Sequence, residues 1–134
     1  MTVTPNVKPA GRFKPKILVV DDEPEARALL ARSLRANGYE ILEAATGEEV
    51  FSRAKQEWPT LIVLDVVLPD LPGTEVLKIL RSDPLTKAIP VLLVTAKPDV
   101  VRQLPTYQEK SDRFVEKPSR IEDLVRTIQE MLGS

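Results

Sequence analysis

The chain has 134 residues, 43% of them hydrophobic, which is enough for one domain with its own core. It contains no cysteine and no histidine, so disulfides, thiolate metal sites, zinc triads and catalysis by a histidine base are excluded. The formal net charge of −1 argues against nucleic acid or anionic lipid as a direct partner. No apolar run approaches the roughly 20 residues that span a bilayer, and no secretion signal opens the chain, which favours a cytoplasmic protein.

The first 15 residues differ in composition from the rest. They hold three prolines, one glycine and three cations, with few apolar side chains. This composition predicts a flexible tail over residues 1–15, followed by one domain over residues 16–134. An acidic partner could bind such a tail, but a solvated leader is the simpler interpretation.

After the tail, short apolar runs alternate five times with helical patterns. The runs predict strands buried on both faces, at residues 17–20, 39–44, 61–64, 91–94 and 114–116. Apolar residues at helical spacing predict a helix after each strand, two of them opened by capping boxes, Thr46 with Glu49 and Ser119 with Glu122. This alternation predicts an α/β fold with a parallel sheet covered on both faces.

Polar residues stand directly after four of the five predicted strands. Asp21 and Asp22 follow the first strand, Asp65 the third, Thr95 the fourth and Lys117 the fifth. Ligands of open parallel sheets bind outside the carboxyl ends of the strands, near the point where strand order reverses. We therefore expect these side chains to converge although they are far apart in the sequence.

The expected group of residues indicates phosphoryl chemistry. Three carboxylates repel one another unless a cation is present, and their hard oxygen atoms suit Mg²⁺. A carboxylate beside Mg²⁺ stays ionised and can attack phosphorus as a nucleophile. Mg²⁺ and Lys117 could then neutralise the oxygens of the phosphoryl group, while the Thr95 hydroxyl donates to one of them.

Four segments resemble the motifs of response-regulator receiver domains. Residues 19–23 resemble the acidic opening, and residues 65–73 the phosphoacceptor segment, with proline four and glycine eight positions after the aspartate. Residues 93–96 resemble the switch threonine with its small neighbour, and residues 114–118 an aromatic residue followed by lysine and proline. The resemblance extends over about residues 16–132, with the usual intervals between the motifs.

The resemblance implies a flavodoxin-like, doubly wound fold with strand order 2-1-3-4-5. It implies that Asp65 is the phosphoacceptor and that Lys117 holds the phosphoryl oxygens. It further implies that Thr95 and Phe114 are switch residues and that a cis peptide bond precedes Pro118. The implied magnesium ligands are Asp21, Asp22, Asp65 and the backbone carbonyl of Val67.

The resemblance also implies partners. A sensor histidine kinase or a phosphotransfer protein would donate the phosphoryl group, and a downstream protein, which the sequence does not identify, would read the change. We expect a stand-alone switch similar to chemotaxis regulators, without direct nucleic-acid binding, because the receiver region occupies nearly the whole chain. Whether an output domain also belongs to the protein stays open. The domain would not be a dedicated enzyme, although magnesium-dependent self-phosphorylation and slow self-dephosphorylation are expected.

The segment between Thr95 and Phe114 departs from the family pattern. Pro98 opens it, Pro105 interrupts it, and residues 110–111 are Lys-Ser where the family commonly has Gly-Ala. Interior proline costs a helix about 3 kcal/mol, so the sequence predicts a fourth helix that is short, kinked or partly unwound around residues 104–107. The charged residues 108–113 are expected to be solvated. The usual dimer and partner face is therefore in doubt.

Two other functions compete with the switch. A receiver-like protein-interaction module would keep the fold without using phosphate. For Phe114 itself, a plain core position is the alternative to a switch residue. An aspartate-type phosphatase or nucleotide-binding protein is disfavoured, because Val67 stands where such phosphatases usually have a second aspartate. The five glycines are also too scattered for a phosphate-binding loop.

Overall fold

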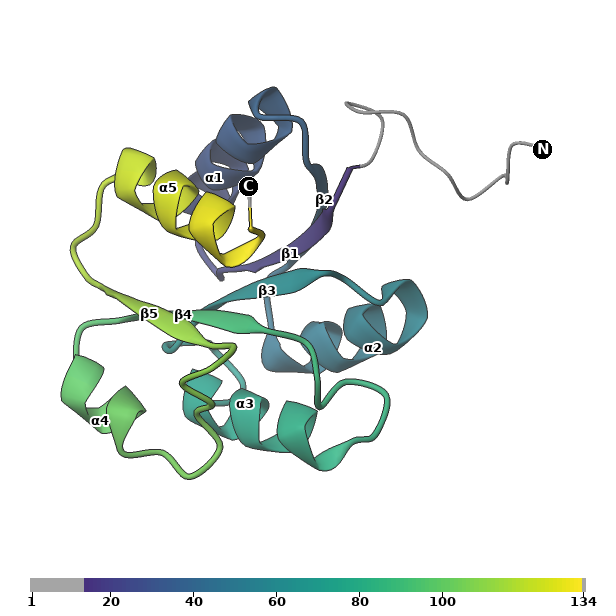
Figure 1. Ribbon diagram of the computed structural model, residues 1–134, viewed down its shortest axis with the longest axis vertical. Helices are drawn as coiled ribbons and strands as arrows, with labels where there is room; N and C mark the ends of the chain where they lie inside the picture. Colours follow the sequence, from purple (N-terminus) through teal and green to yellow (C-terminus); the bar gives the residue numbers. More distant parts are fainter. Residues whose placement is uncertain (1–13, 134) are drawn as a thin grey trace.

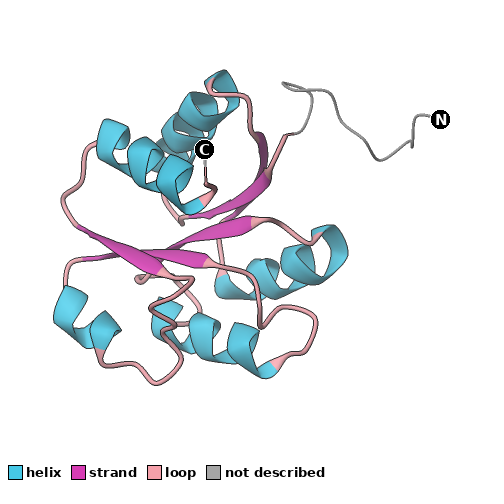
Figure 2. Ribbon diagram, in the orientation of Figure 1, coloured by secondary structure: helices cyan, strands magenta, loops and turns pink. Residues whose placement is uncertain are grey.

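Five strands and five helices alternate along residues 14–133, the part of the chain that the computed structural model describes (Figure 1 and Figure 2). The strands are β1 (Lys16–Val20), β2 (Glu40–Ala44), β3 (Leu61–Asp65), β4 (Val91–Thr95) and β5 (Arg113–Glu116). The helices are α1 (Pro24–Ala36), α2 (Gly47–Glu57), α3 (Gly73–Ser82), α4 (Pro98–Arg102) and α5 (Ile121–Met131). Every predicted strand is present, with each end within one residue of its predicted position. Most of the predicted tail lies outside the described residues, so its flexibility stays a prediction.

The strands form one parallel sheet in the order β2-β1-β3-β4-β5. Helices α1 and α5 cover one face, and α2, α3 and α4 cover the other (Figure 1). The predicted doubly wound fold is therefore confirmed. Strand order reverses between β1 and β3, which creates a crevice at their carboxyl ends.

The sheet separates two apolar clusters. Because side chains alternate along a strand, Ile17 and Val19 of β1 face α1 and α5, while Leu18 and Val20 face the other helices. All of β3 is buried. Burying one such side chain contributes roughly 1.5–3 kcal/mol, so the central strands form a rigid platform for the residues that follow them.

The two predicted capping boxes have different outcomes. The Thr46 hydroxyl accepts a hydrogen bond from the Glu49 backbone N–H at 3.2 Å, so the prediction for α2 is confirmed. The prediction for Ser119 and Glu122 is wrong: Arg120 is the N-cap of α5, without a side-chain cap. The helix begins one residue later than the pattern implied, and Glu122 pairs with Arg120 at 3.6 Å instead.

The only tryptophan of the sequence is exposed. Trp58 is the left-handed C-cap of α2, with φ of 49°, and its backbone N–H donates to the Ala54 carbonyl at 3.1 Å. Pro59 follows, where the helix cannot continue. The side chain is 67% exposed. It therefore adds little to the core.

The fourth helix is short, as the prolines predicted. Helix α4 has five residues, and turns and irregular backbone follow it over residues 103–112 before β5 begins. The helix ends at Arg102, three residues before Pro105. The predicted irregularity around residues 104–107 is confirmed, and contacts other than helical hydrogen bonds must hold this segment.

A buried carboxylate supplies such contacts, and the prediction that all of residues 108–113 are solvated is wrong. The side chain of Asp112 is 0% exposed. One oxygen accepts from Arg81 Nη2 at 2.5 Å and from the Val91 N–H at 2.9 Å, and the other accepts from the Gln108 N–H at 2.9 Å. A carboxylate can be buried when its oxygens are bonded in this way. Asp112 thus joins α3, the start of β4 and the irregular segment.

Replacing Asp112 tests this role. Asp112→Ala leaves the buried Arg81 guanidinium without its counter-charge, and we expect the free energy of unfolding to fall by about 3 kcal/mol or more. Urea denaturation at neutral pH measures the change. The matched control is Asp99→Ala, because Asp99 pairs with Arg102 while 85% exposed, and its loss should cost less than about 1 kcal/mol. Equal losses in the two variants would contradict the assignment.

Candidate functional site

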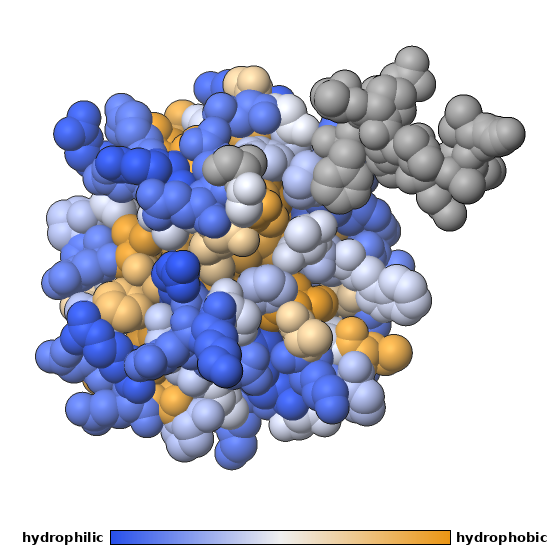
Figure 3. All heavy atoms as spheres, viewed as in Figure 1, coloured by the Kyte–Doolittle hydropathy of each residue, from blue (hydrophilic) through white to orange (hydrophobic). Residues whose placement is uncertain are grey.

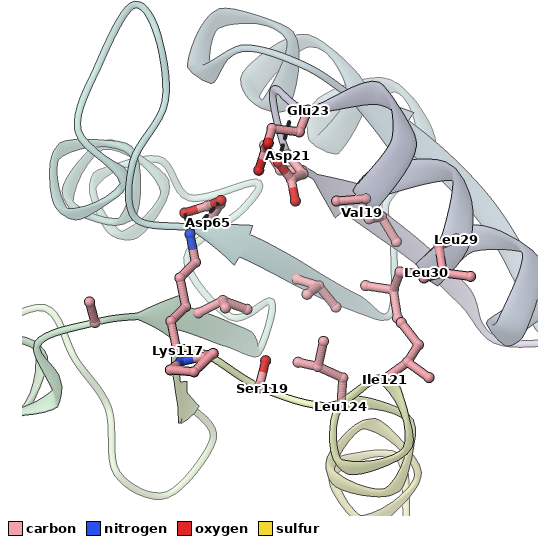
Figure 4. A pocket seen from close by; sticks show the side chains of 16 residues that line it. Val19, Asp21, Glu23, Leu29, Leu30, Asp65, Lys117, Ser119, Ile121 and Leu124 are labelled. Carbon is pink, nitrogen blue, oxygen red and sulfur yellow. Dashed lines mark hydrogen bonds and ion pairs between the residues drawn. The ribbon is translucent and has the colours of Figure 1, made fainter.

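Asp65 lies at the end of β3 and is the centre of the site. It is 6% exposed, and its two oxygens accept hydrogen bonds from Lys117 Nζ at 2.9 and 3.0 Å (Figure 4). One of them also accepts from the Val67 backbone N–H at 3.0 Å. Lys117 is positioned by β5, since its own N–H donates to the Thr95 carbonyl at 2.7 Å and continues the β4–β5 ladder. The Lys117–Pro118 peptide bond is cis, as predicted.

Two further carboxylates meet Asp65 from the end of β1. Oxygen atoms of Asp21, Asp22 and Asp65 all lie within 4.8 Å of one another. Burial raises the pKa of Asp21, and the charge of Asp65 raises it further, although a hydrogen bond from the Glu23 N–H at 2.9 Å opposes both. The cluster therefore carries negative charge that the described protein groups compensate only in part.

The loop that carries Asp21 is held by a residue that the sequence analysis did not identify. Arg27, one turn into α1, donates from Nη1 to the Asp21 carbonyl at 2.7 Å and from Nε to Glu43 of β2 at 3.0 Å. An arginine in the first turns of a helix is common, so the sequence offered no signal for this role. The contact fixes the backbone of the β1–α1 loop against the sheet.

The loop after Asp65 turns back tightly at Gly73. The Gly73 N–H donates to the Val66 carbonyl at 2.6 Å, and a Cβ at this position would lie 2.6 Å from the Val66 Cα. No side chain fits at that distance, so the turn requires glycine. The interval of eight residues between Asp65 and Gly73 was the sequence signal for this loop.

Two cavities border Asp65, and Lys117 lines both of them. Thr95 is buried, its hydroxyl accepts from the Lys97 N–H at 2.9 Å, and it borders a cavity of about 260 Å³ together with Asp65 and Lys117. A larger groove of about 570 Å³ starts at Asp65 and Lys117 and continues between α1 and α5, where its walls are apolar (Figure 4). The site is thus reachable from the surface.

Phe114 does not reach the site. Its ring centroid lies 6.2 Å from that of Tyr107, and the Arg102 guanidinium carbon lies 4.8 Å from its centre. The aromatic ring therefore joins β5 to α4 and to the irregular segment after it. Its predicted role as a switch residue stays a prediction.

The structure brings together the five residues that sequence reasoning selected at the strand ends: Asp21, Asp22, Asp65, Thr95 and Lys117. Val67 is adjacent, with its N–H on Asp65 and its side chain 70% exposed. Three clustered carboxylates with hard oxygen ligands fit a divalent cation such as Mg²⁺. A nearly buried carboxylate held by an ammonium can also act as a nucleophile.

Comparison with known proteins decides the family. The family model of the response regulator receiver domain matches residues 17–129. The chain belongs to this family. It is therefore a domain of two-component signalling, and the predicted resemblance to response-regulator receiver domains is confirmed. Within the described residues 14–133, no helix is long and apolar enough to cross a membrane.

Three relatives illustrate the range of proteins that this receiver domain resembles. The alkaline phosphatase synthesis transcriptional regulatory protein PhoP of Bacillus subtilis is 43% identical over 77% of this chain and 42% of its own length. Protein PilH of Pseudomonas aeruginosa is 32% identical over 88% of this chain and 98% of its own. The receiver domain of the sensor histidine kinase PA1611 from Pseudomonas aeruginosa PAO1 superposes with a TM-score of 0.76 and 25% identity, over 91% of this chain and 100% of that one. Its crystal structure has a magnesium ion coordinated in the active site cleft.

The chain spans about half the length of most of the curated relatives it matches, whereas it spans nearly all of PilH. Receiver domains of this family therefore occur both with and without further sequence.

Removing the charge of Asp21 tests whether its ionised form is disfavoured by burial and by the neighbouring carboxylates. The fold raises the pKa of Asp21, so its ionised form is disfavoured and the free energy of unfolding falls as the pH rises from below 3.8 through the raised pKa. Asp21→Asn keeps an oxygen for the Glu23 N–H and removes the charge, so at neutral pH with chelator it should melt at a higher temperature than wild type. The difference should shrink below pH 3.8. A variant that melts lower than wild type at neutral pH would contradict the conclusion that burial and the neighbouring carboxylates disfavour the ionised form of Asp21.

Proposed function

We propose that this receiver domain is a phosphorylation-dependent signalling switch that accepts a phosphoryl group on Asp65. The observation that carries the proposal is the Asp65 carboxylate, held on both oxygens by Lys117 and within 4.8 Å of two further carboxylates. An acceptor of this kind needs an ionised nucleophile, a cation on the phosphoryl oxygens and access from the surface. The described residues supply or can bind each of these.

The magnesium ligands would be Asp21, Asp22, Asp65 and the backbone carbonyl of Val67. When bound, Mg²⁺ neutralises charge on the carboxylates and on the phosphoryl oxygens. The convergence of the three carboxylates supports this assignment, because their oxygen atoms lie within 4.8 Å of one another. The magnesium ion in the cleft of PA1611 supports it independently.

Each side chain would have a distinct part in the transfer. One Asp65 oxygen attacks phosphorus, the bond from phosphorus to the donor nitrogen breaks, and its electron pair stays on the leaving imidazole. Lys117, whose ammonium already bonds both Asp65 oxygens, can move one hydrogen bond to a phosphoryl oxygen. The Thr95 hydroxyl accepts from Lys97 and can donate its own proton to another phosphoryl oxygen.

The donor would be another protein. The chain has no histidine, so a sensor histidine kinase or a phosphotransfer protein would carry the phosphohistidine. Phosphorylation would move Thr95 and then Phe114, changing the surface around β5 and α4 that a downstream protein reads. We further propose that the protein acts in the cytoplasm without direct nucleic-acid contact and loses its phosphoryl group by slow self-hydrolysis. PilH, of which this chain covers 98%, is a relative of receiver-domain length.

Phosphorylation with a small donor tests the proposal. Wild-type protein incubated with acetyl phosphate and Mg²⁺ should gain about 80 Da in intact mass, the mass of one phosphoryl group. Asp65→Asn should gain nothing, because its amide is no nucleophile, and chelator should abolish the gain in wild type. Peptide mapping should find the adduct on Asp65 alone.

Failure of this experiment would favour the second candidate function. A wild type that forms no adduct and gains no stability from beryllofluoride would not be a phosphoacceptor switch. The hypothesis of a protein-interaction module would then be preferred. The shortened α4 favours this hypothesis because it alters the face of the fold around β5.

Magnesium should also stabilise the fold. A ligand present at about 100 times its dissociation constant adds roughly 2.7 kcal/mol to the free energy of unfolding. Urea denaturation with and without Mg²⁺ measures this gain, and Asp22→Ala should lose most of it because one ligand is gone. An equal gain for wild type and Asp22→Ala would place magnesium elsewhere on the protein.

A further inference from the structure

The start of α2 is bound by a carboxylate from another loop. Asp70 accepts from the Gly47 N–H at 2.8 Å on one oxygen and from the Glu48 N–H at 3.0 Å on the other. The Thr46 hydroxyl accepts a hydrogen bond from the third amide, that of Glu49. The first amides of a helix have no partners within the helix, so all three of these groups need an outside acceptor. Two of them depend on a residue more than 20 positions away in the sequence.

The loop that carries Asp70 is also the loop that follows the acceptor. Residues 66–72 connect β3 to α3, and they begin with Val66 and Val67, directly after Asp65. Gly73 bonds the Val66 carbonyl and closes the loop at its base. Leu71 packs on the start of α2, since a Cβ at Gly47 would lie 3.3 Å from the Leu71 Cβ.

These contacts leave a specific part of the loop to be fixed by Asp70. The base is fixed by glycine at one end and by the bond from the Val67 N–H to Asp65 at the other. The outer part meets the rest of the molecule through the buried side chain of Leu68, through Leu71 against α2 and through the Asp70 carboxylate, which supplies the directional polar contacts. The hydrogen bond from Gly47 is the largest cause of the lowered pKa of Asp70, so the carboxylate stays ionised while it binds the helix.

We propose that Asp70 is a positioning residue of the magnesium site, which fixes the loop carrying the Val67 carbonyl against the N-terminus of α2. The inference rests on the proposed function, in which that carbonyl is a metal ligand. Asp70 acts through the backbone and has no contact with the metal. Without its two hydrogen bonds, the outer part of residues 66–72 keeps the apolar contacts of Leu68 and Leu71, which are non-directional, and the carbonyl samples orientations that do not meet the ion.

Isothermal titration of the folded protein with Mg²⁺ tests the proposal. Asp70→Ala should weaken magnesium binding roughly tenfold, the low end of what residues behind a metal ligand contribute. Asp70→Asn should have a smaller effect, since its amide oxygen can accept from one of the two N–H groups. The matched control is Thr46→Ala, which removes a cap from the same end of α2 without touching the loop. It should destabilise the fold while binding Mg²⁺ within about twofold of wild type.

Phosphorylation kinetics give a second readout. With acetyl phosphate, the magnesium concentration for half-maximal rate should rise about tenfold in Asp70→Ala, while the rate at saturating Mg²⁺ stays within about twofold of wild type. A loss of rate that saturating Mg²⁺ does not restore would overturn the positioning role. So would magnesium affinity equal to wild type in Asp70→Ala, or an equal weakening in Thr46→Ala.

The design separates this inference from the proposed function. If wild type binds Mg²⁺ but forms no adduct, the switch fails, while the titrations still decide the role of Asp70. If Asp70→Ala does not fold, Asp70→Asn decides it, and wild-type affinity in that variant although one of its hydrogen bonds to the Gly47 and Glu48 amides is lost would overturn the role.

Discussion

Electrostatic repulsion among three carboxylates is the constraint on which the rest of the site depends. Asp21, Asp22 and Asp65 converge because they end or follow parallel strands next to the point where strand order reverses. Such a cluster persists only if cations or hydrogen-bond donors face it. Lys117 supplies one cation from β5, so the carboxylates outnumber the cation that faces them. The proposed Mg²⁺ would neutralise this remaining negative charge. The buried strands β1 and β3 provide the stable framework that holds these carboxylates together, since nearly all of their residues are buried.

The residues that carry the chemistry could be predicted from the sequence, whereas most of those that position them could not. Buried strands give unbroken apolar runs, so Asp65 and Lys117 stood out at the ends of two such runs. Arg27 and Asp112 have no such signal, because their side chains are of types that are usually solvated. The partner of Asp112, Arg81, also lies 31 positions away in the sequence. The capping box predicted at Ser119 is also wrong. Ser119 and Glu122 fit the local pattern, but α5 begins one residue later, after Arg120.

The shortened α4 shows how a lost helix can be replaced by other contacts. After five helical residues, the chain is held by the Asp112 carboxylate, by Tyr107 packed on Phe114 and by Arg102 over the same ring. The face shown in Figure 3 is largely hydrophilic, with apolar atoms visible only in small separate areas between charged side chains. A partner that reads this region would therefore meet polar loops and one aromatic cluster in place of a regular helical surface.

Both loops of the acidic site are tethered by a charged residue that does no chemistry. Arg27 of α1 binds the carbonyl of Asp21. Asp70, in the loop after Asp65, binds the first amides of α2 and so attaches that loop to the helix. Each tether uses backbone groups, so it depends little on the side chains of the ligands themselves. Mg²⁺ demands near-ideal octahedral geometry, and its site is therefore sensitive to small loop displacements. In the proposed site, the affinity for Mg²⁺ would therefore depend in part on α1 and α2, because the starts of these helices hold the two loops that carry the ligands.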